Sequence, residues 1–324
     1  MKQAAHLLLA SVLAAMAFAG AAPAQTYPTK PIKVIVGFAP GGPADVMARL
    51  VATKMPAILG QSFIVENRPG AGGTIGAKAA ADADPDGYTL LLGNTSTLVI
   101  SPVVYQNIGY DPVKAFAPVA ELGVTANLLA VNTSLPAKSV PELIALAKAS
   151  PGKLNYASPG AGTPPHLIGE LFKQRTGINI VHVPYKGGGL AIQAVMAGEV
   201  QMTFENTAVS LPLVQAGKLR GLAFTSEKRN SRAPDIPTMI ESGVPGFVTA
   251  SFTGIVAPAG TPAGIVSRLN VAINECLKSP DVQATLTKLS VEPHIGSPDE
   301  FAAFLARERG TWVPLVKAAN VKAE

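Results

Sequence analysis

Residues 32–45 read IKVIVGFAPGGPAD, and this stretch decides the fold class. Apolar side chains alternate with other residues over 32–38, which is the period of a half-buried strand. Residues 39–43 then form a turn of glycine and proline, and the apolar positions of 46–55 recur at helical spacing. A strand, a glycine turn and a helix in direct succession predict an α/β fold.

The same unit recurs through the middle of the chain. Residues 153–157 predict a strand, residues 158–162 (SPGAG) a glycine loop, and Thr163-Pro164 the start of a helix. Further strands are predicted at 178–185, 200–204 and 219–225, with helices at 190–197 and 207–216 between them. Alternation at this spacing favours parallel-rich sheets flanked by helices and joined by right-handed crossovers.

The remaining segments fit the same pattern. Residues 62–66 and 88–92 predict two more strands, and a capping box at Ser139 and Glu142 predicts a helix that ends near residue 150. Ser-Pro and Thr-Pro pairs at 261, 279 and 297 are typical of helix starts. We therefore expect the C-terminal quarter to be mainly helical.

Composition excludes several classes of protein. The chain has 324 residues, is 48% hydrophobic and only 15% charged, and its formal net charge is +5. Intrinsic disorder requires the opposite balance, and the length favours two domains. The basic residues form no run and do not alternate with aromatic residues, so no nucleic-acid partner is predicted.

The N-terminus has the pattern of a cleavable secretory signal. Lys2 precedes an apolar run over 7–19, and the small residues 22–24 form a cleavage site ahead of Gln25. We therefore predict a signal peptide over 1–24 and a mature protein in the periplasm. The apolar run is short for a permanent membrane anchor.

Motifs for catalysis, metals and cofactors are lacking in the sequence. It contains no G-x-S-x-G elbow or P-loop. In residues 70–76, the glycine that would be the third of a dinucleotide fingerprint is Gly76, one place too late. His166, His182 and His294 form no ligand pair by spacing. We predict no cofactor, no metal and no enzyme activity, although Asp45, Glu205 and His166 leave a secreted hydrolase or lyase as the alternative.

Glycine loops and hydroxyl residues follow several predicted strands. They lie at 38–42, 94–97, 158–163, 186–189 and 205–207. The carboxyl ends of parallel strands meet at one edge of a sheet, and the helix N-termini there present unpaired N–H groups. Of these segments, only 186–189 contains a basic side chain, Lys186. The pattern predicts an anion site built mainly from neutral donors.

Five linked motifs carry a resemblance to a known family. They are FAPGGPAD at 38–45, VENRPGAGG at 65–73, SPGAGT at 158–163 with His166, HVPYKGG at 182–188 and APAGTP at 257–262. In this order they resemble the substrate-binding proteins of tripartite tricarboxylate transporters (TTT), the Bug family of extracytoplasmic solute receptors. The resemblance covers essentially the whole chain after the predicted signal.

The resemblance implies a two-lobe periplasmic binding protein of type II-like architecture, with the ligand cleft between the lobes. Lobe 1 would combine residues 26–124 with 226–324, and lobe 2 would be residues 125–225. The chain would cross between the lobes twice. The residues that the resemblance nominates for ligand binding, with Thr95 and Asn206 as additions, are Phe38, Pro40, Gly41, Gly42, Asp45, Thr95, Ser158, Ala161, Gly162, Thr163, His166 and Asn206.

The function implied is capture of a small organic carboxylate and delivery to the integral-membrane permease subunits of the transporter. A monomer suits such a shuttling receptor. A ligand-binding partner of a membrane sensor is a further alternative. Family members commonly have Asp where this chain has Glu205, so the shape of the distal pocket is left open, as is the identity of the carboxylate.

Overall fold

The computed structural model describes residues 27–185 and 187–318 of the chain. The predicted signal peptide, residues 1–24, lies outside the described residues and stays a prediction. Among the residues that are described, no helix combines the length and the apolar composition needed to cross a membrane.

The strands form one continuous mixed sheet. They are β1 (Ile32–Val36), β2 (Phe63–Asn67), β3 (Thr89–Asn94), β4 (Phe116–Val131), β5 (Asn155–Ser158), β6 (Val181–Pro184), β7 (Met202–Asn206), β8 (Arg220–Phe224) and β9 (Ala250–Pro258). Their order is β2-β1-β3-β9-β4-β7-β5-β6, and β8 also pairs with β4. The α/β fold class is confirmed.

Helices flank this sheet on both sides. They are α2 (Pro43–Ala52), α3 (Met55–Leu59), α4 (Thr74–Ala81), α5 (Ser101–Val104), α6 (Val140–Ala149), α7 (Pro164–Thr176), α8 (Gly188–Ala197), α9 (Thr207–Gln215), α10 (Ala263–Lys278), α11 (Pro280–Lys288) and α12 (Pro298–Ala318). Two short helical turns, η1 (Ala71–Gly73) and η2 (Ser96–Ile100), precede α4 and α5.

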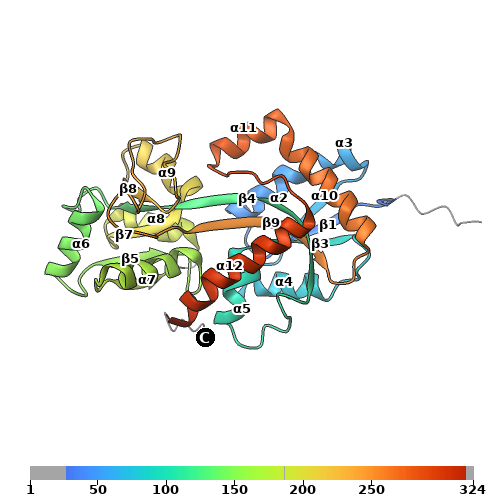
Figure 1. Ribbon diagram of the computed structural model, residues 1–324. Helices are drawn as coiled ribbons and strands as arrows, with labels where there is room; N and C mark the ends of the chain where they lie inside the picture. The colour runs from blue at the N-terminus through green and yellow to red at the C-terminus, as the bar shows by residue number, and fades with distance from the viewer. Residues whose placement is uncertain (1–26, 186, 319–324) are drawn as a thin grey trace, which may run out of the picture.

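The molecule has two halves joined by two long strands. Strands β1–β3 with α2–α5, α10 and α11 form the first half, and β5–β8 with α6–α9 form the second (Figure 1). Strand β4 pairs antiparallel with β9 up to Ala126, then with β7 from Asn127 onward. Both crossing strands therefore belong to one hydrogen-bonded ribbon.

Parallel pairing is confined to the interior of each half. Strand β1 is parallel to β2 and β3, and β5 is parallel to β6 and β7. The crossing strands pair antiparallel with their neighbours, and so does β8, which lies beside β4. The predicted parallel units are thus present, but the sheet as a whole is mixed because the chain must run into the second half and back again.

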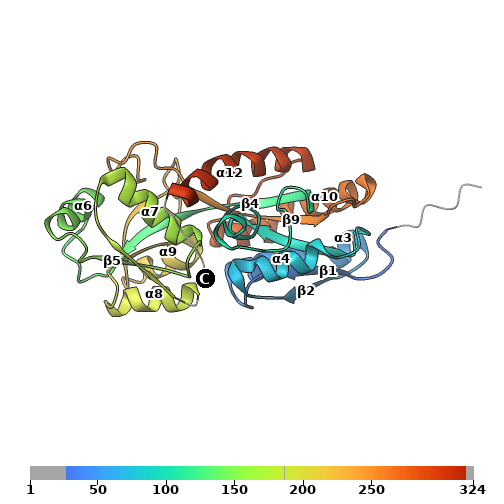
Figure 2. The same cartoon turned by 90° about the horizontal axis from the view of Figure 1, so that it is seen from below.

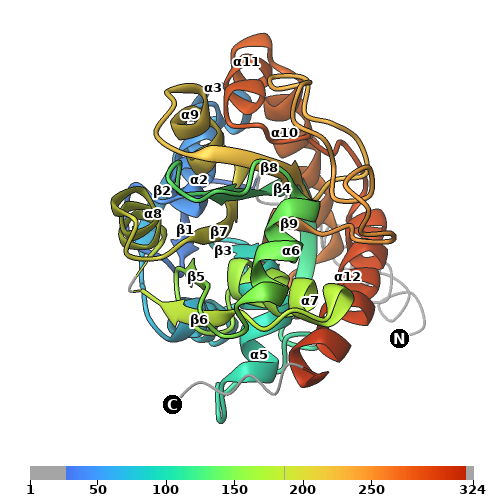
Figure 3. The same ribbon diagram turned by 90° about the vertical axis from the view of Figure 1, so that its left-hand side faces the viewer.

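Apolar packing explains why these segments hold together. In the first half, Val34 of β1 packs in one cluster with Met47 of α2 and Leu269 of α10. In the second half, Leu128, Val195 and others form a separate cluster. Seen from the end of the second half, α8 and α9 lie on one side of the strands and α6, α7 and α12 on the other (Figure 3).

Helix α12 packs against the crossing strands. Phe301 and Phe304 contact Phe252 of β9, with ring centroids 6.2 and 5.3 Å from it. Gly254 of β9 lies under the Phe301 ring, where any Cβ would overlap that ring. Helix α12 therefore stiffens the ribbon near its middle.

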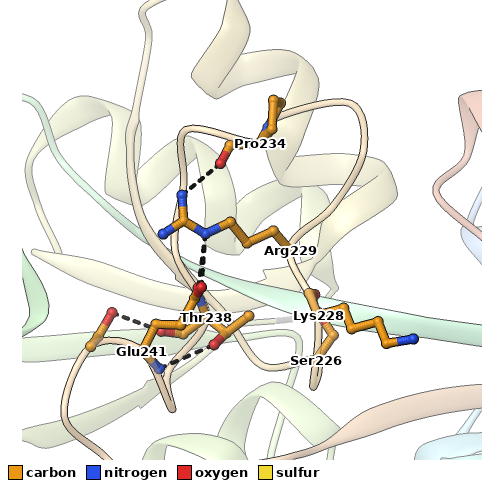
Figure 4. A network of polar contacts seen from close by, with 7 residues as sticks. Ser226, Lys228, Arg229, Pro234, Thr238 and Glu241 are labelled. Atoms are coloured by element: carbon orange, nitrogen blue, oxygen red, sulfur yellow. Dashed lines mark hydrogen bonds and ion pairs between the residues drawn. The ribbon is translucent and has the colours of Figure 1, made fainter.

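The segment between β8 and β9 returns along the second half. Arg229 donates to both carboxylate oxygens of Glu241 at 3.0 and 2.9 Å and to the carbonyl of Pro234 (Figure 4). The Met239 N–H donates to the Phe224 carbonyl of β8, and Phe247 lies edge-on to Phe172 of α7. Most of residues 226–249 thus pack on elements of the second half, but Arg232 donates to the Lys288 carbonyl and to Ser290 Oγ at the end of α11 in the first half.

Candidate functional site

The turn after β1 is held in shape by Asp45. This side chain is buried, and its Oδ2 accepts hydrogen bonds from the Gly41 N–H and from Arg49 Nε, both at 2.9 Å. Its Oδ1 accepts from Asn67 Nδ2 at 2.9 Å, and the same nitrogen donates to the Phe38 carbonyl. The Arg49 hydrogen bond lowers the pKa of Asp45 to about 2. The carboxylate therefore stays ionised and fixes the turn.

Glycines on the next segment let the turn pack closely. The Phe38 ring lies against Gly73, where a Cβ would come within 3.1 Å of it. Gly73 also has a left-handed backbone, with φ of 93°. A side chain at this position would displace Phe38, so the VENRPGAGG segment sets the position of the first turn.

The turn after β5 has a similar internal support. Ser158 Oγ lies 2.6 Å from His182 Nε2 and accepts from the Gly160 N–H at 3.1 Å. Thr163 Oγ1 donates to the Gly160 carbonyl at 2.8 Å. This network closes the SPGAGT loop directly ahead of α7.

Two histidines lie behind this loop. His166 Nδ1 accepts the Gly162 N–H at 3.1 Å, and its ring stacks on that of His182. Burial lowers the pKa of His166 to about 4 and that of His182 to about 3. Both rings are therefore neutral near pH 7, and a neutral Nδ1 is what the Gly162 N–H requires as its acceptor.

The last two residues predicted to bind the ligand, Thr95 and Asn206, lie at the ends of β3 and β7. Thr95 is buried, and its Oγ1 accepts the Phe252 N–H at 2.9 Å, which ties the end of β3 to β9. Asn206 begins α9, and its side chain accepts the Ala208 N–H at 2.9 Å. Both residues thus have structural partners within the chain.

Contact between the halves occurs next to these turns. A Cβ built on Gly162 would lie 3.0 Å from both methyl carbons of Val104 at the end of α5. Helix α5 in turn adjoins the VENRPGAGG segment, since Ser101 Oγ donates to the Gly72 carbonyl at 3.0 Å. In Figure 2, α4 of the first half and α8 of the second lie on either side of the middle of the molecule.

The nominated residues differ in how far they are available to a ligand. Pro40 and Gly41 are exposed, while the half-buried members are Phe38, Gly42, Ala161, Thr163 and Asn206. Asp45, Thr95, Ser158, Gly162 and His166 are buried. In the two turns, the buried members with side chains mostly position backbone groups, and the half-buried members line the surface.

Sequence reasoning gave too little weight to two residues of this site. Asn67 ends β2 beside β1, so its position at the carboxyl end of a parallel strand was a usable signal. His182 lies in a predicted strand, where a histidine is ordinarily structural, and no spacing rule relates it to His166. Only the parallel pairing of β5 with β6 brings it to Ser158.

The structure does not assemble the alternative catalytic set. Asp45 is held by Gly41, Arg49 and Asn67, and no hydrogen bond within the described chain joins it to His166 or Glu205. The described residues also contain no group of three or more His, Cys, Asp or Glu side chains arranged to hold a metal ion.

Comparison with known proteins gives consistent relatives. Residues 47–321 match the model of the tripartite tricarboxylate transporter family receptor. The chain is 40% identical to protein BugT of Bordetella pertussis over 319 residues, which is 97% of this chain and 98% of that protein.

Solved structures agree with this match. The R. palustris Rpa4515 structure with adipate has a TM-score of 0.86 at 38% identity and covers 91% of this chain and 99% of its own. MatC from Rhodopseudomonas palustris with bound malate has a TM-score of 0.82 at 33% identity, and the match covers 90% of this chain and 100% of MatC. These relatives are solute-binding receptors rather than enzymes, and the predicted periplasmic-binding-protein fold is confirmed. The chain belongs to the tripartite tricarboxylate transporter family of receptors.

Proposed function

We propose that this protein binds a small organic carboxylate between its two halves and delivers it to a membrane permease. The observation that carries the proposal is the matched construction of the turns after β1 and β5. Each turn is fixed from behind by buried side chains, Asp45 with Asn67 in one and His166 with His182 in the other. Helix α2 begins directly after one turn and α7 after the other.

This construction suits an anion because the hydrogen-bond donors we propose are neutral. They are mainly the main-chain N–H groups of the two turns and of the starts of α2 and α7. Helix N-termini carry partial positive charge and attract a carboxylate. In the first turn, Arg49 is already paired with Asp45. A carboxylate is therefore held without a full counter-charge, which permits release at the permease. The adipate and malate bound to the two solved relatives support this chemistry.

Closure would take place about the β4–β9 ribbon. We propose that the lobes meet where β4 changes its antiparallel partner between Ala126 and Asn127, close to the predicted boundary at 124/125. Most of residues 226–249 pack on the second half, so we propose that they move with it and that the Arg232 hydrogen bonds to Lys288 and Ser290 cross between the lobes. Ligand binding favours the closed form to the extent that both turns contact the ligand only there.

The other parts of the proposal follow from the family. The receptor would be exported to the periplasm by the predicted signal peptide, act as a monomer and dock on the permease subunits. No catalytic step is part of it.

A thermal-shift screen over mono-, di- and tricarboxylates tests the proposal. We expect one or a few acids to raise the unfolding temperature in a saturable manner, with no product formed during incubation. Turnover of an acid would instead support the hydrolase or lyase alternative. Failure of every acid to stabilise the protein would contradict the proposed function.

A further inference from the structure

Glu205 has a carboxyl group that the described residues leave incompletely hydrogen-bonded. It is the second-last residue of β7, at the carboxyl end of the strand, and is only 5% exposed. A Cβ built on Gly188, the first residue of α8, would lie 3.1 Å from Glu205 Oε2 and 3.7 Å from the Pro159 ring. The carboxyl group thus faces the start of α8 beside the turn that follows β5.

Its two oxygen atoms differ in their bonding. Oε1 accepts the Asn206 N–H at 2.8 Å. Oε2 is buried and has no hydrogen-bond partner among the residues that the structure describes. Burial raises the pKa of Glu205, and the Asn206 N–H opposes this shift only in part. A buried neutral acid has an O–H group to donate, and native proteins rarely leave such a donor unsatisfied.

The surroundings favour an acceptor that carries negative charge. Glu205 Oε2 faces the N-terminus of α8, where the helix has partial positive charge. Neither α8 nor α9 carries an ionisable side chain within its bounds. The titratable residues on the other elements around β7 are Glu121 on β4, Tyr156 on β5, His182 on the adjoining β6, and His166, Glu170, Lys173 and Arg175 on α7. None of these makes a hydrogen bond or ion pair with Glu205. Besides the Asn206 N–H, only the partial positive charge of the α8 N-terminus therefore opposes the effect of burial on this carboxyl group.

We infer that Glu205 binds in its neutral form to a second acid group of the ligand, donating a hydrogen bond to it at the N-terminus of α8. The inference rests on the proposed function, in which the first carboxylate lies at the turns after β1 and β5. The ligand is then a diacid. Binding requires a proton on Glu205, so the affinity falls as the pH rises and ionised Glu205 repels the ligand.

Isothermal titration with matched pairs of acids tests this inference. The probes are unbranched dicarboxylates, such as adipate, and the monocarboxylates of equal chain length, such as hexanoate. We expect the preferred dicarboxylate to bind the wild type about tenfold more tightly than its monocarboxylate partner. Titration in two buffers of different ionisation enthalpy should show proton uptake at pH values where Glu205 of the free protein is ionised. Affinity should fall as the pH rises, although the ligand itself stays ionised.

Three variants separate the role of Glu205 from a structural one. Glu205→Gln keeps a neutral donor, so it should bind the dicarboxylate within about threefold of the wild type but without proton uptake or a pH slope. Glu205→Met should lose about tenfold in dicarboxylate affinity and keep its monocarboxylate affinity. Glu199→Gln, at an exposed position in the same half, should change neither.

Lys186 is outside the described residues, and an ion pair with it would be a competing role for Glu205. In that case Glu205→Gln and Lys186→Met would lower the thermal midpoint alike, and binding would take up no proton. That result would overturn the inference, as would equal affinity for mono- and dicarboxylates or a loss in Glu205→Gln as large as in Glu205→Met. If monocarboxylates bind but dicarboxylates gain nothing, only this inference fails. If neither class binds, the proposed function fails.

Discussion

The imidazole rings of His166 and His182 stack with their centroids 3.7 Å apart and their planes inclined by 7°. His166 holds the Gly162 N–H and His182 contacts Ser158 Oγ, so one stacked pair supports both ends of the SPGAGT loop. Two protonated rings at this separation would repel each other, and a protonated His166 would lose its acceptor for Gly162. Acid should therefore disturb this loop directly.

The first prediction concerns stability at mildly acidic pH. Both histidines have pKa values below the ordinary 6.5, at about 4 and about 3, so the unfolded chain takes up protons first as the pH falls. Their contribution is complete above pH 6.5 and is lost as the pH falls toward those values. At about 1.4 kcal/mol per pKa unit, we expect the pair to lose on the order of 5 kcal/mol of unfolding free energy between pH 6.5 and about pH 4.5, measured by urea unfolding.

The double variant His166→Asn/His182→Gln is the control for this prediction. Asn and Gln place amide groups near the former Nδ1 and Nε2 positions but do not titrate. Its stability should change less than that of the wild type between pH 6.5 and about pH 4.5, a range above the ordinary pKa of the carboxylates. If the unfolding free energies of the two proteins fell equally with pH, the two histidines would not be the cause of the acid sensitivity.

The second prediction tests access to the first turn. Gly42 has φ of −78°, and a Cβ there would meet only the Ala39 carbonyl, at an ordinary 3.5 Å. Gly42→Val should therefore fold normally, yet it places a branched side chain where the carboxylate would approach. We expect about a tenfold or greater loss of affinity for the acid identified in the screen, with nearly the same thermal midpoint.

Gly264→Val provides the matched change, since a Cβ at Gly264 in α10 meets nothing within 4 Å. It should leave affinity unaltered. Equal affinity of Gly42→Val and the wild type, measured by isothermal titration, would remove Gly42 from the site.

The third prediction concerns Asp45 as the support of that turn. Asp45→Asn cannot accept all of the hydrogen bonds from Gly41, Arg49 and Asn67, so we expect a loss of about 1–3 kcal/mol in unfolding free energy. Because the pKa of Asp45 is lowered from 3.8 to about 2, the contribution of its charge is complete above pH 3.8. It is lost as the pH falls toward 2.

Asp281→Asn is the comparison, because Asp281 pairs with Lys54 at an exposed position. It should cost much less than Asp45→Asn, because solvent screens this exposed pair. A similar cost for the two variants in urea unfolding at neutral pH would show that Asp45 does not organise the turn.

The fourth prediction concerns the bond between β3 and β9. Thr95→Val keeps the side-chain shape but removes the acceptor of the buried Phe252 N–H, and should destabilise the protein by about 1–3 kcal/mol. Thr95→Ser retains the hydroxyl and should recover most of this loss. Equal destabilisation by the two substitutions would contradict the role assigned to the hydroxyl, because only Thr95→Ser retains it.

The local units of this fold were predictable because each has its own period. The strand and helix of residues 32–52 and the SPGAGT loop with α7 stand where the sequence places them. The direction in which a side chain faces was less predictable. Val46 belongs to the apolar positions expected on the buried face of this helix, but it is 36% exposed. The buried face of α2 runs through Ala44, Met47, Ala48 and Val51, which turns Val46 away from the core.

The crossing strands were not predicted as strands. Strand β4 lacks a steady alternation because its register with β9 shifts at Pro118/Ala120 and again at Glu121/Gly123, and because it changes neighbours after Ala126. The close approach of His166 to His182 also depends on long-range pairing, which no local spacing encodes. Motif order could nominate the site, but only the tertiary structure separates its supporting residues from its lining residues.

Strands β4 and β9 lie side by side and run in opposite directions, so the chain enters and leaves the second half at neighbouring points. Topologically, that half is an insertion into a hairpin of the first. Cutting both strands where Ala126 pairs with Ala250 would remove residues 127–249 as one continuous segment. The second half is therefore a candidate for exchange between receptors of different ligand preference.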